Sequence, residues 1–226
     1  MSERGDLTER LGRGWTHDPD GDLYIHAATQ LPFVWVDGGS MRMGITEDDR
    51  LAARRYVPST PETTALLDEL TARAPVRTVD VAPFLCAQRP LLAPDVARLT
   101  EGRLEHDMFT WPEACDLAAE LGFRLPTEAE LEWLARDGRG LSFALDVARR
   151  FEEGTLPRAH SRFGVYDLLE PQWSSDRWND QDEGVYRGYF VAGIQSRDEL
   201  LLALSGARYR GRDDEAALRL VADVPS

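Results

Sequence analysis

The sequence contains no lysine. All 26 basic residues are arginine, and with 40 acidic residues the formal net charge of the 226-residue chain is −14. The absence of lysine excludes Schiff-base chemistry with pyridoxal phosphate, phosphate-binding loops that end in Gly-Lys, and the lysine of protein kinases. The acidic balance argues against nucleic acid and anionic membranes as partners, because both are bound mainly through positive charge.

Cysteine and histidine are also scarce. The two cysteines, Cys86 and Cys115, are too far apart in the sequence to indicate a disulfide framework or a CxxC motif. No HxH or HxxxH pair is present, so a zinc site built on clustered ligands is not expected. The four histidines are His17, His26, His106 and His160. Few cysteines and the lack of an apolar leader segment lead us to expect a cytoplasmic protein.

Long hydrophobic runs are absent too. No stretch approaches the roughly 18 apolar residues of a membrane-spanning helix. The hydrophobic content of 42% is nevertheless sufficient for a sizeable core. We expect a polar N-terminal extension at residues 1–30 and one main domain at residues 31–223.

Short strands and helices alternate irregularly in the main domain. The apolar run 31–36, the Asp37-Gly38 pair and residues 41–44 predict a hairpin. Two helix-like segments, the second with Leu66, Leu67 and Leu70 at helical spacing, form an insert at 46–74. Further strands are expected at 76–84, 162–166, 186–191, 207–210 and 218–221, and a polar loop is expected at 173–183.

Capping boxes indicate where the helices begin. Thr110-Trp-Pro-Glu113 and Thr127-Glu-Ala-Glu130 each place a threonine three residues before a glutamate, and Ser196-Arg-Asp-Glu199 is a third example. Residues 141–153 are a further candidate helix. Short strands mixed with at least two helices, without regular βαβ alternation, predict an α+β fold.

Several motifs follow one another in an order that is more informative than any one of them. They are Asp37-Gly-Gly-Ser-Met-Arg-Met-Gly44, Arg124-Leu-Pro-Thr-Glu-Ala-Glu-Leu-Glu132, Ser161-Arg-Phe-Gly-Val-Tyr-Asp-Leu168, Arg208-Tyr-Arg210 and Leu218-Arg-Leu-Val221. In this order the chain resembles the formylglycine-generating enzyme family, also called the sulfatase-modifying factor family. The resemblance spans about residues 33–221. It implies an irregular α+β fold related to C-type lectins, with long loops.

The residues that would hold copper in this family are replaced. Its copper-dependent members oxidise a substrate cysteine with oxygen, using two thiolates that precede the Arg-Tyr-Arg motif. Thiolates suit Cu(I) because both are soft. Counting back from Arg208-Tyr-Arg210 places the two positions at Leu201 and Gly206, which have no donor atom. We therefore expect no formylglycine formation by the family's known route.

A calcium site of the family is altered as well. Its Asn and Glu ligands correspond to Pro171 and Ser174, although Trp173 between them is retained. We therefore predict no calcium at this position. The acidic residues Asp176, Asp180, Asp182 and Glu183 are either a substitute cation site or a solvated loop.

Two hypotheses of function remain. The first is a catalytically degenerate domain, a pseudoenzyme that acts as a binding or accessory module and needs no cofactor. Its ligand, a protein, peptide or small molecule, would contact Trp173, Arg208, Tyr209 and Arg210, because an aromatic beside guanidinium groups suits anions or peptides. The second is an oxygen-dependent oxidoreductase that acts on a small molecule or a peptide through a rebuilt non-haem iron site, for example one that uses His106 and His160.

Overall fold

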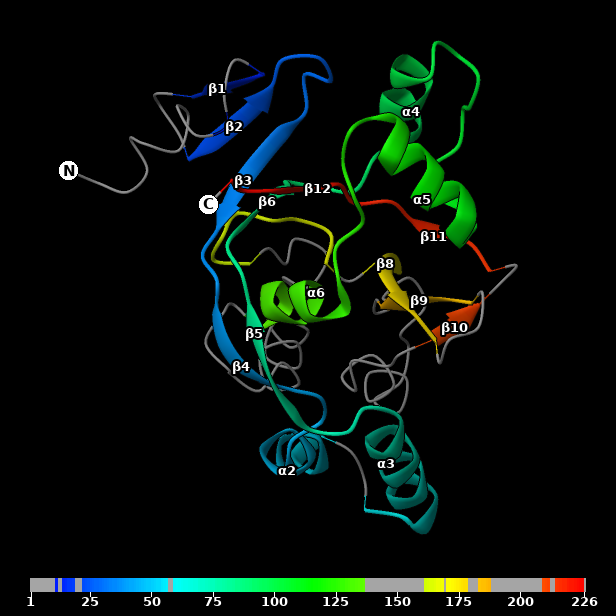
Figure 1. The fold of residues 1–226 in the computed structure, drawn as a ribbon. Helices are drawn as coiled ribbons and strands as arrows, with labels where there is room; N and C mark the ends of the chain where they lie inside the picture. Colours follow the sequence, from blue (N-terminus) through cyan, green and yellow to red (C-terminus); the bar gives the residue numbers. More distant parts are fainter. Residues whose placement is uncertain are drawn as a thin grey trace, which may run out of the picture.

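The computed structural model describes residues 11, 14–18, 22–56, 59–136, 161–168, 170–178, 183–187, 209–211 and 214–225. These residues form two five-stranded sheets, a two-stranded ribbon and five helices (Figure 1). Antiparallel sheets combined with a few helices confirm the predicted α+β class.

The first sheet has the strand order β1-β2-β3-β6-β12, with antiparallel pairing throughout. Its strands are β1 (Trp15–His17), β2 (Leu23–His26), β3 (Pro32–Val36), β6 (Phe84–Ala87) and β12 (Val221–Asp223). Two strands of the expected N-terminal extension thus extend this sheet, while the domain boundary at residue 30 stays a prediction.

The predicted hairpin between residues 31–36 and 41–44 is wrong. Strand β4 (Gly39–Met43) pairs with β5 (Arg77–Val81), whereas β3 pairs with β2 and β6. The chain continues through Gly38 instead of reversing there. Gly38 is required at this position because an added Cβ would lie 2.3 Å from the Val81 carbonyl oxygen.

The same bend divides the strand that was expected at residues 76–84. Pairing of Val36 with Phe84 and of Gly39 with Val81 keeps one register across the bend. Strands β3 and β4 therefore run beside β6 and β5 as one bent antiparallel pair (Figure 1). Pro83 lies at the break, where its missing N–H interrupts the ladder of hydrogen bonds.

The helical insert connects the two strands of the ribbon. It contains α2 (Glu47–Tyr56) and α3 (Pro61–Arg73), in agreement with the helix-like pattern of this segment. In Figure 1 both helices lie at the end of the β4–β5 ribbon, opposite from α4 and α5. Leu67 is buried, and the side chains of Leu66 and Leu70 lie outside the described set.

The second sheet has the strand order β10-β9-β8-β11-β7. Its strands are β7 (Met108–Phe109), β8 (Gln172–Arg177), β9 (Gly184–Arg187), β10 (Tyr209–Gly211) and β11 (Ala216–Ala217). The polar loop predicted at 173–183 is wrong where β8 stands, because cross-strand pairing and burial of Trp173 override the polar composition. The strand expected at 162–166 is reduced to a turn at 162–163 and a single β-bridge residue, Tyr166.

Three helices accompany these sheets, namely α4 (Ala93–Leu99), α5 (Trp111–Glu120) and α6 (Glu128–Ala135). The second and third begin at the predicted capping boxes. In α6 the Thr127 hydroxyl accepts from the Glu130 amide at 3.1 Å, and the Glu130 carboxylate accepts from the Thr127 amide at 2.7 Å. The helices expected at 141–153 and after Ser196 lie outside the described residues.

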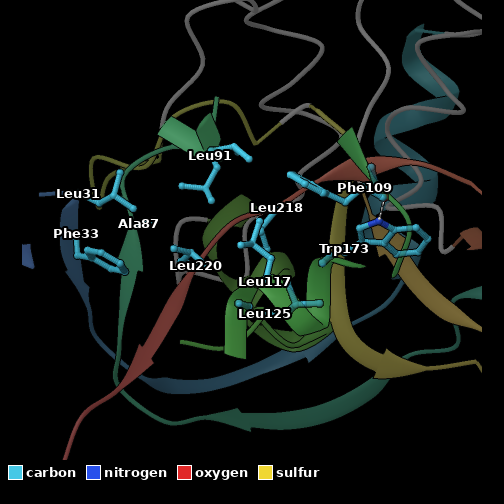
Figure 2. Close-up of a cluster of buried hydrophobic side chains, with 14 of the residues drawn as sticks. Leu31, Phe33, Ala87, Leu91, Phe109, Leu117, Leu125, Trp173, Leu218 and Leu220 are labelled. Carbon is cyan, nitrogen blue, oxygen red and sulfur yellow. Dashed lines mark hydrogen bonds between the residues drawn. The ribbon is translucent and has the colours of Figure 1, made fainter. Parts of the chain in front are cut away.

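The core consists of two clusters of buried side chains. The larger joins β3, α5 and the C-terminal strands, and includes Leu31, Phe33, Leu117, Trp173 and Leu218 (Figure 2). The smaller packs the other face of β3 against α6 through Val34, Val36, Trp133 and Leu134. Strand β3 is therefore covered on both faces, which explains its uninterrupted apolar sequence.

Candidate binding surface

Three of the four residues predicted to bind a ligand belong to strands β8 and β10. Tyr186 of β9 pairs with Trp173 on one side and with Tyr209 on the other, so these three residues are aligned across the sheet. Arg210 pairs with Val185. Arg208 lies outside the described residues, as do the side chains of Tyr209 and Arg210.

Trp173 is a core residue in this arrangement. Its side chain is fully buried, and its indole N–H donates to the Phe109 carbonyl at 2.5 Å (Figure 2). Its ring packs edge-on against Tyr186. An indole satisfies its one donor and buries a large apolar area in this way. The contacts of Trp173 are therefore structural, and a ligand contact for it stays a prediction.

A second tryptophan is also a core residue, with 8% of its surface exposed, but it lies beneath an exposed arginine. Trp111 opens helix α5 and donates its indole N–H to the Ser174 carbonyl at 2.8 Å. The Arg177 guanidinium lies over its ring, 5.5 Å from the centroid. Gly184 makes this approach possible, since an added Cβ would lie 2.1 Å from Trp111 Cγ. In the sequence, the capping box at 110–113 predicts only a helix start at Trp111, and no local pattern points to Arg177.

A tyrosine of β9 and a carboxylate beside the edge strand β10 lie next to each other. The Tyr186 hydroxyl donates to Asp214 Oδ2 at 3.2 Å. The Asp214 side chain lies so close to Gly211 of β10 that an added Cβ there would be 2.4 Å from Asp214 Oδ2. Together with Trp111 and Arg177 these groups form what we call the β8–β10 surface, defined by Trp111, Arg177, Tyr186 and Asp214. Its mixture of Trp, Tyr and Arg is typical of recognition surfaces.

A buried ionic network lies between this sheet and the helical insert. Arg136 donates to Glu132 at 2.8 Å and to Asp49 at 3.1 Å, and Arg187 donates to the other oxygen of Glu132 at 2.5 Å. Burial by itself raises the pKa of Glu132, but Arg187 and Arg136 outweigh it, so the pKa lies below its usual value. Glu132 is therefore held as a carboxylate.

Asp176 belongs to the acidic segment that was considered as a substitute cation site. Its carboxylate accepts from the Glu128 amide at 2.6 Å, at the first turn of α6. A carboxylate at this place is favoured by the free amides and the dipole of the helix. Asp180 and Asp182 lie outside the described residues, so the cation site they were considered for is untested.

The two cysteines do not provide the donor set that the resembled family uses for copper. Cys86 lies in β6 and is fully buried, whereas Cys115 lies in α5 and is half-buried. Burial raises the pKa of each thiol to about 11. Copper requires two thiolates converging on one point. Cys86 and Cys115 lie on separate elements and neither is a preformed thiolate, so they do not match this donor set.

The histidine pair considered for iron is untested, because only His106 of the two lies among the described residues. His106 Nδ1 lies 3.1 Å from the Met108 carbonyl oxygen and its ring packs against Phe109, while His160 is not among the described residues. Where the structure is described, no group of three or more His, Cys, Asp or Glu side chains has an arrangement suited to a metal ion. Within the same ranges, no helix is long and apolar enough to cross a membrane.

Comparisons with known proteins support the fold of the chain but do not assign it a function. No family model matches the chain, and neither does any curated protein. Among solved structures, however, the same irregular α+β architecture is found. One example is PvdO from Pseudomonas aeruginosa, which is 16% identical in sequence, with a TM-score of 0.63 over 90% of this chain and 98% of that chain. At this identity the similarity concerns the fold alone.

Proposed function

We propose that the chain is a divergent, catalytically degenerate relative of the formylglycine-generating enzymes, with their C-type-lectin-like fold, and that it acts as a binding or accessory module. The collinear motifs support this placement, and the fold shared with PvdO is compatible with it. The motif at 124–132 contains the capping box at 127–130, which starts helix α6. Because this role is structural, the motif supports a shared fold rather than a shared activity.

The absence of metal-binding side chains at the two copper positions of the family is the main support for the proposal. The family's two copper positions are Leu201 and Gly206, and the chain's two thiols are buried groups with a pKa of about 11. A thiol is a good metal ligand or nucleophile only as the thiolate. Burial disfavours the thiolate at both cysteines, and neither cysteine stands at one of the two positions that hold copper in the family.

The β8–β10 surface is the place where we expect a ligand. Arg177 supplies a planar cation whose apolar face rests on Trp111, and Tyr186 lies on the neighbouring strand. A guanidinium held over an indole suits anions because its N–H groups form charge-assisted hydrogen bonds with carboxylates and with peptide carbonyls. The ligand class that suits this chemistry is an anionic small molecule or a peptide with carboxylate groups.

Metal analysis of the full chain tests the loss of copper chemistry. The protein is loaded anaerobically with Cu(I) or Fe(II), desalted and measured by elemental analysis beside a Cys86→Ala, Cys115→Ala double variant. We expect substoichiometric copper, equal in both proteins. Stoichiometric copper that the double variant loses would overturn the proposal. Stoichiometric iron with oxygen-dependent turnover would also overturn it, in favour of the iron oxidoreductase.

A further inference from the structure

One carboxylate touches two parts of the molecule that are otherwise far apart in sequence. Glu132 Oε1 accepts from the Gly44 amide at 2.8 Å, and Glu132 Oε2 accepts from Arg187 of β9 at 2.5 Å. Gly44 is the residue at which the chain leaves β4 for the helical insert. Glu132 therefore joins the insert to the central strand of the three-stranded group β8–β9–β10.

The two ends of the insert meet at a narrow neck. The Ile45 amide donates to the Ala74 carbonyl at 3.0 Å, and Gly44 adopts a φ of +101° with Pro75 so close that an added Cβ would lie 2.6 Å from its carbonyl oxygen. Arg136 donates to the Gly44 carbonyl at 2.8 Å. Helix α6 and the residue that ends it thus bind both polar groups of Gly44, the N–H through Glu132 and the carbonyl through Arg136.

Helix α2 of the insert contacts the same network. Asp49 lies in the first turn of α2, accepts from Arg136 at 3.1 Å, and also accepts from the Thr46 amide at 2.9 Å. The side chains of Asp49, Glu132, Arg136 and Arg187 are only 5–7% exposed. Buried charges tolerate little displacement, because a group that moves away leaves its partner uncompensated in a medium of low dielectric.

At the end away from the insert, the ionic network reaches strand β9, which contributes Tyr186 to the β8–β10 surface. Arg187 ends β9, and Tyr186 immediately before it pairs with β8 and β10. Arg187 also approaches Glu128 at 3.9 Å, so two carboxylates of α6 face its guanidinium. A displacement of Glu132 is therefore transmitted to β9 through a buried hydrogen bond rather than through solvent.

We propose that Asp49, Arg136, Glu132 and Arg187 form a coupling device, through which the position of the helical insert sets the conformational stability of strand β9 and of the β8–β10 surface. A partner that binds the insert would thereby regulate ligand binding at this surface. The coupling itself does not depend on the proposed function, since it concerns the folded chain without any ligand.

Hydrogen exchange of the full chain, followed by mass spectrometry, tests the coupling. Asp49→Asn removes the charge of Asp49, which contacts neither β9 nor Arg187. We expect exchange at residues 184–187 to become at least about fivefold faster, the lower end of typical coupling between sites. Exchange in β3 and β6 should change much less. Faster exchange confined to residues 46–74 would overturn the proposal.

The matched control is Asp68→Asn, the same change of charge in the same insert. Asp68 forms an exposed ion pair with Arg50 at 2.6 Å and does not belong to the network. We expect its effect to stay within the insert, and an equal effect on β9 would contradict the proposal. Asp49→Asn could also accelerate exchange throughout the chain by destabilising the whole fold. In that case we compare the urea midpoints of Asp49→Asn, Arg187→Gln and the double variant. Strictly additive shifts would overturn the coupling, and a double variant less affected than the sum would support it.

Discussion

Because the chain has no lysine, every buried or paired basic side chain in it is an arginine. Arg219 is fully buried and donates to Gln172 Oε1, the Ala87 carbonyl and the Tyr166 carbonyl, at 2.7, 2.8 and 2.5 Å. Burial lowers the pKa of Arg219, yet a guanidinium keeps its charge far above neutral pH. Its planar set of five donors meets three acceptors on separate segments, which the single ammonium of lysine would not reach.

Arg177 is the residue on which ligand binding at the β8–β10 surface should depend. With triglutamate as the probe, Arg177→Gln should weaken binding about tenfold, the equivalent of about 1.4 kcal/mol, because a charge-assisted hydrogen bond is lost. Isothermal titration calorimetry measures the affinity. Arg98→Gln, an exposed arginine on α4, is the control of equal charge. Equal weakening by both variants would indicate non-specific attraction and contradict the assignment of the surface.

Among the described helices, α6 combines a capping box, core packing and buried contacts to the insert. Its capping box fixes its start, Trp133 and Leu134 pack into the core, and Glu132 and Arg136 hold the neck of the insert. Helix propensity alone contributes little to so short a segment. The cap and the tertiary contacts therefore determine where α6 lies.

Removal of the α6 cap should have a measurable cost. Thr127→Ala deletes the hydroxyl that accepts from the Glu130 amide, and we expect the free energy of unfolding to fall by about 1 kcal/mol. Urea denaturation measures the change.

The control is the same substitution inside a helix, Thr71→Ala in α3. The Thr71 hydroxyl caps no free amide, since it donates to the Leu67 carbonyl of the preceding turn at 2.7 Å. Alanine has the higher helix propensity, which offsets the lost hydrogen bond, so stability should change by less than about 0.5 kcal/mol. An equal loss in both variants would show that the cap contributes nothing.

The folding stability of the whole molecule should include a contribution from His26 that is lost as the pH falls. Burial lowers the pKa of His26, whose ring packs against Trp15 and Phe123. The unfolded chain then binds a proton more readily than the folded one, so this contribution is present above about pH 6.5 and is lost as pH falls through the lower pKa of the folded state. Glu132, whose pKa is also lowered, acts in the same direction at more acidic pH.

The melting temperature measured between pH 8 and pH 5 checks the histidine contribution. His26→Phe retains an aromatic ring beside Trp15 but no longer titrates, so we expect its melting temperature to depend less on pH than that of the wild type. Glu113 and Glu62, whose pKa values are lowered by local hydrogen bonds, remain in both proteins. An unchanged slope between pH 7 and pH 5 would exclude His26 as its source.

The sequence predicted much of the fold because many of its signals are local. The capping boxes at Thr110 and Thr127, the two helices of the insert and the apolar strand β3 were all predicted correctly. The hairpin at Asp37-Gly38 was not, since a turn pair describes only the residues beside it. Whether β3 pairs with β4 or with β6 depends on segments some 50 residues away, which local periodicity does not contain.

The candidate site shows the same division. Residue identities are enough to show that the chain has no lysine and that Leu201 and Gly206, which correspond to the copper ligands of the resembled family, have no donor atom. The folded structure is needed to show that Trp173 is a core side chain, that Arg177 lies over Trp111, and that Glu132 joins the insert to β9. Burial and pairing arise from contacts between distant segments, so they become defined only when the chain has folded.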